Sequence, residues 1–291
     1  MSSHSRTEAI IFSLGKKFYW NLPFWVFKRL YLLRNIKEIS PTLHFKSKSG
    51  CIEIFGETSA ERIFIGQRER IHLYWKGVQN RIDELLLQYR IDEIELQEQV
   101  LDGHWIVDIG ANVGEFSLGL IRKYPSLKVL AIEPGPKEHY ALSKNLSNLP
   151  FAQTKNENFA LWKERTTLKF FHKNQTGDSS LLPSEVTKNY SVVQVDTLDS
   201  LTKKHDIKKI LILKLEAEGA EPEILLGALE TLKSVTYVTA DLGPERGPSQ
   251  ERTYEKCRDL LTGAGFEEIG IPPESREVYL FRNTSMSNAN K

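Results

Sequence analysis

A glycine turn between an apolar strand and a helix constrains this chain more than any other feature. The run from Val107 to Gly114 reads V-D-I-G-A-N-V-G, so an apolar strand carrying Asp108 breaks at Gly110 before a helical pattern begins. Glycine allows the backbone to approach a ligand closely. The next apolar run ends at Glu133, where a carboxylate is placed to hold a ribose diol. Together these residues predict a nucleoside-binding crevice.

The spacing of the glycines indicates which kind of nucleoside fits. A dinucleotide site normally carries G-x-G-x-x-G, because the pyrophosphate sits on the helix N-terminus. Here Asn112 stands in place of the middle glycine, and the acidic Asp108 is a poor neighbour for a pyrophosphate. A cationic nucleoside such as S-adenosylmethionine suits acids at both strand ends. The alternative is a purely structural turn, which Asp108 caps and Asn112 stabilises through its side chain.

Strand and helix patterns alternate from Trp105 to Arg282, which predicts an α/β fold with a parallel sheet. The expected strands are 105–109, 128–132, 158–162, 211–216 and 235–240, with 267–271 and 277–282 as a closing antiparallel pair. The expected helices are 114–123, 136–146, one ending near 233, and 252–263, and apolar residues at helical spacing up to Tyr89 predict an earlier helix at 78–89. Ligands of such sheets bind beyond the carboxyl ends of the strands. The acids at that edge are Asp108, Glu133, Glu216 and Asp241.

Residues 1–77 form a separate N-terminal extension in this interpretation, followed by a catalytic domain at 78–282 and a disordered tail at 283–291. The extension contains a helix beginning near Pro23 and a hairpin made of residues 42–46 and 51–55. Residues 18–34 are rich in aromatic side chains and cations but too short to span a bilayer. Two interpretations stay open for them: a helix packed on the core or on a partner subunit, and a peripheral helix at a membrane surface.

Charge is distributed unevenly along the chain. The net charge is +1, yet residues 1–50 hold nine Lys and Arg against two Asp and Glu, so the rest of the chain is acidic. An acidic catalytic region argues against a nucleic-acid substrate. Cys51 and Cys257 suggest no disulfide framework, and no signal-peptide pattern precedes residue 20. We therefore expect a cytoplasmic protein, in one interpretation peripheral at the inner face of the membrane. The sequence leaves the oligomeric state open.

Three blocks of residues resemble the FkbM-type S-adenosylmethionine-dependent methyltransferases. The Val107–Gly114 run resembles the family's cofactor motif, and I-E-P-G-P at 132–136 resembles its ribose-binding strand end. L-K-L-E-A-E-G-A-E at 213–221 resembles its lysine, acid and E-G-A-E segment. The resemblance covers about residues 80–282. It implies a Rossmann-like class I methyltransferase sheet with closing antiparallel strands, S-adenosylmethionine as cofactor, and O-methylation of sugars or secondary metabolites. The implied cofactor-binding residues are Asp108, Gly110, Asn112, Gly114 and Glu133.

Glu216 and Glu218 are the candidate catalytic residues, either as general base or as ligands of the acceptor hydroxyl. The alternative is that they orient the loop through backbone N–H groups. Where the family usually carries Asp, this chain has Glu216, which moves the carboxylate by one bond. His172 is a second candidate base, with a solvent-facing hairpin residue as the alternative. The insert from Lys163 to Tyr190 is expected to cover a small-molecule or glycan acceptor, and this region is expected to be β-rich, with residues 167–172 and 191–195 extended.

Three alternatives to this function are weighed against it. Glu216, Glu218 and Asp241 could jointly bind Mg²⁺, but the resemblance does not require a metal, and we expect none. A nucleotide-dependent dehydrogenase is disfavoured by the missing third glycine. A non-catalytic binding protein on a methyltransferase fold is disfavoured by the intact glycine turn and Glu133.

Overall fold

The computed structural model describes residues 19–58, 61–94, 96, 103–149, 153–172, 179–183, 189–273 and 276–285. Within these residues no helix is long and apolar enough to cross a membrane. The chain forms two compact units, Met1–Arg81 and Ile82–Lys291. The parts of the expected insert at 173–178 and 184–188, and the tail at 286–291, lie outside the described residues.

The first unit consists of a helix and a small antiparallel sheet, as the sequence predicts. The helix begins directly after Pro23, a residue whose fixed φ suits a helix start. The predicted hairpin is present, and a third strand that the sequence analysis missed pairs with it in the order β1-β2-β3. Its elements are α2 (Phe24–Asn35), β1 (His44–Lys48), β2 (Cys51–Phe55), β3 (Arg62–Ile65) and the 3-10 helix η2 (Arg68–Tyr74).

The second unit is built on a sheet with strand order β14-β15-β11-β10-β4-β5-β6. Strands β6, β5, β4, β10 and β11 run parallel, and β15 pairs antiparallel with both β11 and β14. This arrangement confirms the expected class I methyltransferase sheet with antiparallel closing strands. The strands are β4 (Trp105–Ile109), β5 (Lys128–Ile132), β6 (Thr154–Glu157), β10 (Ile210–Leu215), β11 (Val235–Asp241), β14 (Phe266–Ile269) and β15 (Val278–Asn283).

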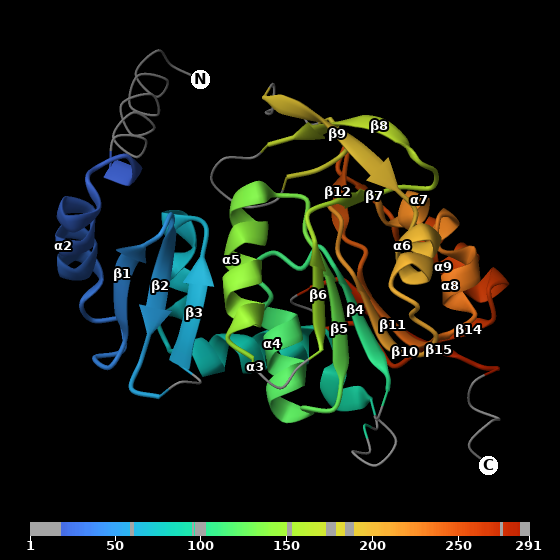
Figure 1. Ribbon diagram of the computed structural model, residues 1–291, viewed down its shortest axis with the longest axis horizontal. Helices are drawn as coiled ribbons and strands as arrows, with labels where there is room; N and C mark the ends of the chain where they lie inside the picture. The colour runs from blue at the N-terminus through green and yellow to red at the C-terminus, as the bar shows by residue number, and fades with distance from the viewer. Residues whose placement is uncertain are drawn as a thin grey trace. The chain divides into compact units, whose positions relative to one another are not determined.

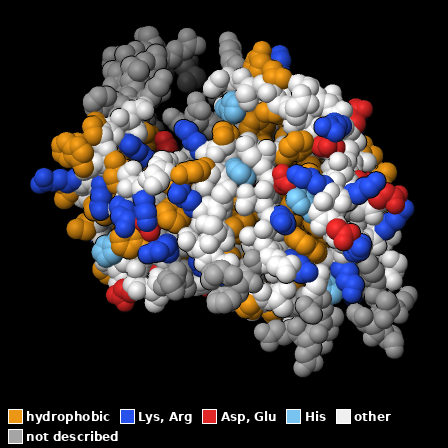
Figure 2. Space-filling view, viewed as in Figure 1, with side chains coloured by type: hydrophobic (Ala, Val, Ile, Leu, Met, Phe, Trp, Pro, Cys, Tyr) orange, Lys and Arg blue, Asp and Glu red, His pale blue; other side chains and the backbone are white. Residues whose placement is uncertain are grey.

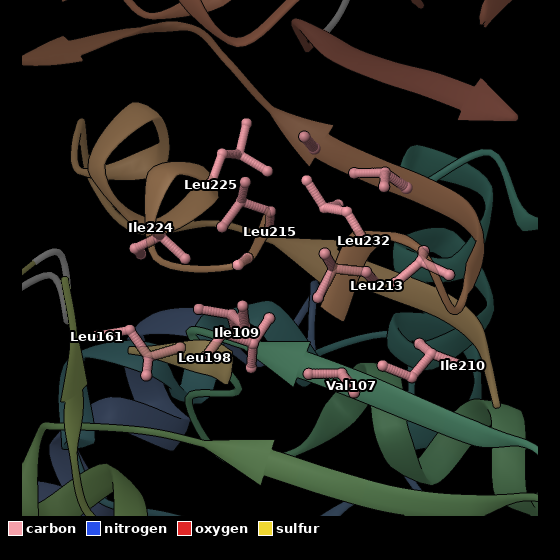
Figure 3. Close-up of a cluster of buried hydrophobic side chains, with 14 of the residues drawn as sticks. Val107, Ile109, Leu161, Leu198, Ile210, Leu213, Leu215, Ile224, Leu225 and Leu232 are labelled. Carbon is pink, nitrogen blue, oxygen red and sulfur yellow. The ribbon is translucent and has the colours of Figure 1, made fainter. Parts of the chain in front are cut away.

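Helices cover both faces of this sheet (Figure 1). Side chains alternate along each strand, so Ile106 faces one hydrophobic cluster while Val107 and Ile109 face the other. The first cluster packs against α3 (Val78–Gln88), α4 (Glu115–Lys123) and α5 (Pro136–Ser147). The second cluster packs against α6 (Leu198–Lys204), α7 (Glu221–Leu226), α8 (Leu229–Leu232) and α9 (Tyr254–Gly263). Figure 3 shows the second cluster, with side chains from β4, β10 and the helices meeting in one apolar layer.

The expected third strand at 158–162 is wrong. The third parallel strand is β6 at Thr154–Glu157, which is polar because it forms the edge of the sheet. Only Ala160–Leu161 of the expected segment is a strand, β7, and it belongs to a separate sheet of order β7-β9-β8. The predicted extended segments of the insert are present in that sheet as β8 (Thr166–Phe171) and β9 (Tyr190–Asp196).

Other boundaries also differ from the sequence analysis. The helix expected to end near residue 233 is divided into α7 and α8, and the short helix α6 was missed. A small hairpin, β12 (Pro244–Arg246) and β13 (Glu251–Arg252), follows β11. The expected tail began at residue 283, but the Asn283 side chain is buried and donates to the carbonyl oxygen of Val235 at 3.0 Å. Asn283 is therefore part of the folded unit.

Candidate functional site

The turn after β4 has a shape that requires glycine at Gly110. This residue has a φ of 69°, and a Cβ atom there would lie 1.9 Å from the backbone oxygen of Glu216. Its amide donates to the carbonyl oxygen of Ile132 at 3.0 Å. Gly114, with a φ of 89°, caps α4, and a Cβ atom there would lie 2.6 Å from Cδ1 of Leu142. The turn therefore fits closely between β5 and the segment after β10.

Glu133 lies at the end of β5 with its carboxylate beside the glycine turn. Its Oε2 accepts from the amide of Asn112 at 2.8 Å, and its Oε1 accepts from the amide of Gly135 at 2.6 Å. Burial raises the pKa of Glu133 to about 7, and the nearby carboxyl of Glu138 adds to the shift. Each oxygen keeps a lone pair after these bonds. Glu133, which the sequence analysis predicts to bind a ribose, therefore lies at the turn. Both of its carboxylate oxygens can still accept a hydrogen bond from a hydroxyl group.

Asp108 lies in the interior behind the turn, with no exposed surface. Its Oδ2 accepts from the hydroxyl of Ser117 on α4 at 2.6 Å, and its Oδ1 lies 3.3 Å from Nζ of Lys214. These contacts favour the alternative in which Asp108 holds the turn and the helix that follows it. A direct contact between Asp108 and a cofactor stays a prediction.

Lys214 ties the glycine turn to the end of β10. Its Nζ donates to the carbonyl oxygen of Gly110 at 2.7 Å and lies 2.9 Å from Oε2 of Glu216. Burial favours the neutral lysine, but Glu216 and Asp108 outweigh it and raise the pKa of Lys214. Lys214 is therefore a buried cation that positions the turn. It contacts two carboxylates, Asp108 and Glu216, rather than a single partner.

Glu216 is engaged by cations on both carboxylate oxygens. Oε1 is paired with Nη2 of Arg276, and Oε2 is paired with Lys214. Burial opposes ionisation of Glu216, but these two cations outweigh it and hold its pKa well below the usual range. A carboxylate in this state is a weak proton acceptor. The geometry therefore favours Glu216 as an orienting group over Glu216 as a base.

Arg276, just before β15, links the strand ends across the sheet. Its Nε donates to Oδ2 of Asp241 at 2.5 Å, and its Nη2 donates to the hydroxyl of Tyr89 at 3.2 Å. The guanidinium also lies over the Tyr89 ring, 5.0 Å from its centroid. The predicted edge of acids is therefore present, with Glu216 and Asp241 brought together by one arginine.

The loop after β10 is held by Glu221, the first residue of α7. Its Oε1 accepts from the amides of Ala217 at 2.8 Å and Gly219 at 3.0 Å. Glu218 lies between them with a φ of 52°, and its carbonyl oxygen accepts from the hydroxyl of Ser180 at 2.8 Å. Glu221 thus starts α7 and also shapes the loop that carries Glu218.

The β12–β13 hairpin brings a further carboxyl, Glu245, to the same edge. Arg246 clamps the hairpin, because its Nη1 donates to the carbonyl oxygen of Gly219 at 2.6 Å and to Oε2 of Glu223 at 2.7 Å. Gly219 packs so closely that a Cβ atom there would lie 2.6 Å from Cα of Arg246. Burial, followed by the charge of Asp241, raises the pKa of Glu245 to about 8. Glu245 is therefore a half-buried carboxyl that ionises near neutral pH.

Sequence reasoning missed Arg276, Glu245 and the contact of Tyr89 with this site. Tyr89 was recognised only as an apolar residue of the 78–89 helix. Arg276 precedes a closing antiparallel strand, and no spacing rule connects such a loop to the parallel strand ends. Glu245 offered one usable signal, since it follows β11 within a few residues, as Glu216 follows β10.

His172, the second candidate base, contacts residues of the neighbouring strands β8 and β9. Nε2 of His172 is hydrogen-bonded to the hydroxyl of Ser191 at 2.9 Å, and its ring packs edge-on against Phe170. No group of three or more His, Cys, Asp or Glu side chains suited to a metal ion occurs in the described part of the chain. Glu216 and Asp241, two of the conceivable Mg²⁺ ligands, are both paired with Arg276.

The residues at the turn fit a bound nucleoside such as S-adenosylmethionine. Oδ1 of Asn112 is buried and has no hydrogen-bond partner within the described residues. A buried acceptor without a donor is costly unless a ligand supplies one. The carboxylate of Glu133 lies beside it, joined to the Asn112 amide. Gly110 and Gly114 let the turn pack directly against the backbone of Glu216 and the side chain of Leu142.

Comparisons with known proteins agree with this arrangement. A family model described as the methyltransferase FkbM domain matches residues 108–268, which is more than half of the chain. Methyltransferase sdnD of Sordaria araneosa is 31% identical, and the alignment covers 50% of this chain and 73% of that protein. The 2-O-methyltransferase NoeI of Sinorhizobium fredii is 21% identical, with 79% of this chain and 99% of that protein covered.

The similarity to solved structures is weak. The magnesium protoporphyrin IX methyltransferase of Synechocystis, solved with bound S-adenosylmethionine, has a TM-score of 0.41 and 12% identity. That alignment covers 71% of this chain and 79% of the other. The likeness concerns the fold alone.

Proposed function

The chain belongs to the FkbM family of S-adenosylmethionine-dependent methyltransferases, and on that premise we propose that it methylates a hydroxyl oxygen of a saccharide or a secondary metabolite. The relative NoeI, which aligns over 79% of this chain, is named a 2-O-methyltransferase. The observation that carries the proposal is the half-buried Glu245 at the strand-end edge. An alcohol needs a nearby base as it reacts, and a carboxyl that ionises near neutral pH is suited to that task.

The cofactor side of the proposed site consists of Asp108, Gly110, Asn112, Gly114 and Glu133. Glu133 is proposed to accept hydrogen bonds from the ribose hydroxyls, and the unpaired Oδ1 of Asn112 to accept from a donor on the cofactor. The two glycines are proposed to give the turn the shape that brings Asn112 beside Glu133. The buried Asp108 is proposed to act mainly through Lys214, which holds the turn in place.

The acceptor side consists of Glu216, Glu218 and Glu245. Glu216 is proposed to orient the acceptor hydroxyl, because its charge is fixed by Lys214 and Arg276. Glu245 is proposed to take the proton from that hydroxyl. Glu218, on the loop that the hairpin contacts, is proposed as a further ligand of the acceptor.

The bound cofactor supplies a methyl group on a positively charged sulfur, which becomes a neutral thioether when the methyl leaves. The protein's residues contribute alignment, worth about 7–11 kcal/mol in well-oriented reactions, and proton removal, worth about 10²–10⁴-fold. The clamped hairpin and the tight turn keep Glu245 and Glu133 on rigid supports, which alignment requires.

The test is product identification with S-adenosylmethionine labelled with carbon-13 at the methyl group. The purified chain is incubated with a panel of monosaccharides, oligosaccharides and hydroxylated metabolites, and the products are analysed by NMR and mass spectrometry. The proposal expects the label in a methoxy group. A labelled methyl group on nitrogen or carbon would refute it, as would binding of cofactor without transfer to any hydroxyl of the panel.

A further inference from the structure

The outward side of α2 exposes large apolar side chains that nothing in the described structure covers. Trp25 is 74% exposed, Leu33 65% and Ile36 70%. With Arg29 they follow one another at spacings of four, four and three residues, so they lie along one stripe of the helix. We call this stripe the outward face. Isolated exposed apolar residues are common, but a contiguous row of them marks an interaction surface.

The opposite side of α2 anchors the helix to the first unit. Phe27 and Tyr31 are buried, and their rings pack against each other at 5.2 Å between centroids. Tyr31 also packs edge-on against Phe45 of β1 and accepts a hydrogen bond from Nε1 of Trp75 at 2.8 Å. The helix therefore has a fixed orientation on its unit, and the outward face is presented by a rigid support.

Cations accompany the apolar residues of the outward face. Arg29, Arg34 and Lys37 are exposed, and α2 contains no acidic residue. Lys46 and Lys48 of strand β1 are about half exposed, but both are paired with the buried Glu53, so the charge of the outward face comes from the three cations on and after α2. Figure 2 shows Lys and Arg side chains interleaved with hydrophobic ones over α2 and the β1–β3 sheet. On a surface of this composition, the apolar side chains can insert into an apolar layer while the Lys and Arg side chains attract negatively charged groups.

We infer that the outward face of α2 docks on the surface of an anionic lipid bilayer. Tryptophan and leucine side chains insert at the boundary between headgroups and acyl chains, and neighbouring Lys and Arg side chains pair with anionic headgroups. A second copy of the chain is disfavoured, because a twofold interface would set the cations of one α2 against the same cations of the other. This inference does not depend on which acceptor the enzyme uses.

The first experiment tests the apolar residues by co-sedimentation of the full chain with vesicles. Vesicles of phosphatidylcholine with phosphatidylglycerol are compared with vesicles of phosphatidylcholine alone. The double variant Trp25→Glu with Leu33→Glu should lose at least about tenfold in partitioning onto the anionic vesicles. Ile271→Glu is the control, because Ile271 is an apolar residue of the second unit that is more exposed, at 85%, than either of these two.

The second experiment tests the cations. Arg29→Glu, Arg34→Glu and Lys37→Glu together should lower partitioning by on the order of 100-fold, since each basic residue near an anionic surface contributes about fivefold. Lys208→Glu is the control, because its side chain is 76% exposed and lies in the second unit. Raising the salt concentration should reproduce the effect of the triple variant, because salt screens headgroup attraction.

Each outcome decides the inference. It is supported if the wild type binds anionic vesicles more strongly than neutral ones and only the α2 variants lose binding. It is overturned if the wild type does not bind anionic vesicles, or if the α2 variants bind as the controls do. A wild-type dimer that becomes monomeric in the Trp25→Glu with Leu33→Glu variant, by analytical ultracentrifugation, would also overturn it in favour of a second copy. Far-UV circular dichroism and tryptophan fluorescence, to which Trp75 of the first unit contributes, are measured for every variant and show that this unit, which carries the α2 substitutions, stays folded.

Discussion

Carboxyl groups at the strand-end edge differ in charge state because their partners differ. Glu216 lies between Lys214 and Arg276 and is ionised throughout the physiological range. Glu133 and Glu245 are raised to pKa values of about 7 and about 8, chiefly by burial. One edge thus offers a fixed negative charge beside two groups that titrate near neutrality.

Glu133→Gln should weaken the binding of S-adenosylhomocysteine, because an amide offers one acceptor oxygen where the carboxylate offers two. In the wild type the affinity should fall about tenfold between pH 8 and pH 6, because protonation below a pKa of about 7 removes an acceptor. The variant should lose this pH dependence. Calorimetry at three pH values measures it, with the exposed Glu164→Gln as control. An unchanged pH dependence in Glu133→Gln would remove Glu133 from the ribose site.

The same pKa has a consequence for stability. Between the ordinary pKa of a glutamate and about 7, the folded protein holds a proton on Glu133 that the unfolded chain releases. The free energy of unfolding without cofactor should therefore fall as the pH rises through this window. Denaturant unfolding at pH 5.5 and pH 7.5 measures this fall in the free energy of unfolding. The fall should be smaller in Glu133→Gln than in the wild type.

Arg276→Met should destabilise the fold by about 2 kcal/mol or more, because it leaves Glu216 and Asp241 facing each other without their shared cation. The loss should be smaller at pH 5 than at pH 8, since protonation relieves unpaired carboxylates. Arg252→Met is the control, because the side chain of Arg252 is 62% exposed and solvent screens its pairing with Glu277. Equal losses of unfolding free energy in Arg276→Met and Arg252→Met would mean that the buried ion pairs of Arg276 stabilise the fold no more than an exposed pair does.

Among the elements, those with strong periodicity were the most predictable. Strands β4 and β5 are apolar runs bounded by turns, and the structure reproduces their expected bounds. The edge strand β6 was missed because T-K-N-E carries no apolar pattern, whereas the apolar segment that follows it contributes only the short β7. The acids at the parallel strand ends could be predicted from topology. Arg276 and Tyr89 could not, because they reach the site from a closing loop and a helix end that no sequence spacing relates to it.

The glycine turn is the element whose geometry is most restrictive. Gly110→Ala should destabilise the protein by at least about 2 kcal/mol, because it combines a positive φ with a clash against the backbone oxygen of Glu216. Gly263→Ala, in α9, is the matched control, since a Cβ atom there meets nothing within 4 Å. That substitution should be neutral or stabilising by about 0.5–1 kcal/mol. Chemical denaturation measures both, and a neutral Gly110→Ala would contradict the tight fit of the turn.

At the scale of the whole molecule, the basic charge and the proposed site lie in different parts of the chain. Residues 1–50 are strongly basic, and the remaining sequence is acidic. The proposed site draws only on residues of the second unit, and the hydrophobic clusters around its sheet begin with Leu85 of α3. The proposed boundary before residue 78 therefore leaves the methyltransferase domain with its core intact.

A chain of residues 78–291 should fold and bind S-adenosylhomocysteine with an affinity close to that of the full chain. The reason is that the described core and all proposed cofactor residues lie within it. Calorimetry and thermal melting compare the two chains. Loss of binding in a folded 78–291 chain would show that the first unit completes the cofactor site.

The most direct test of the central claim is the pH dependence of methyl transfer by the wild type and by Glu245→Gln, with labelled cofactor and an acceptor found in the screen. The account predicts a methoxy product whose kcat/KM rises toward pH 8 in the wild type. In the variant this rise should disappear and the rate should fall about 10²-fold or more, while S-adenosylhomocysteine binds as before. A product methylated at nitrogen or carbon, or a variant that keeps both the rate and the pH profile, would contradict it.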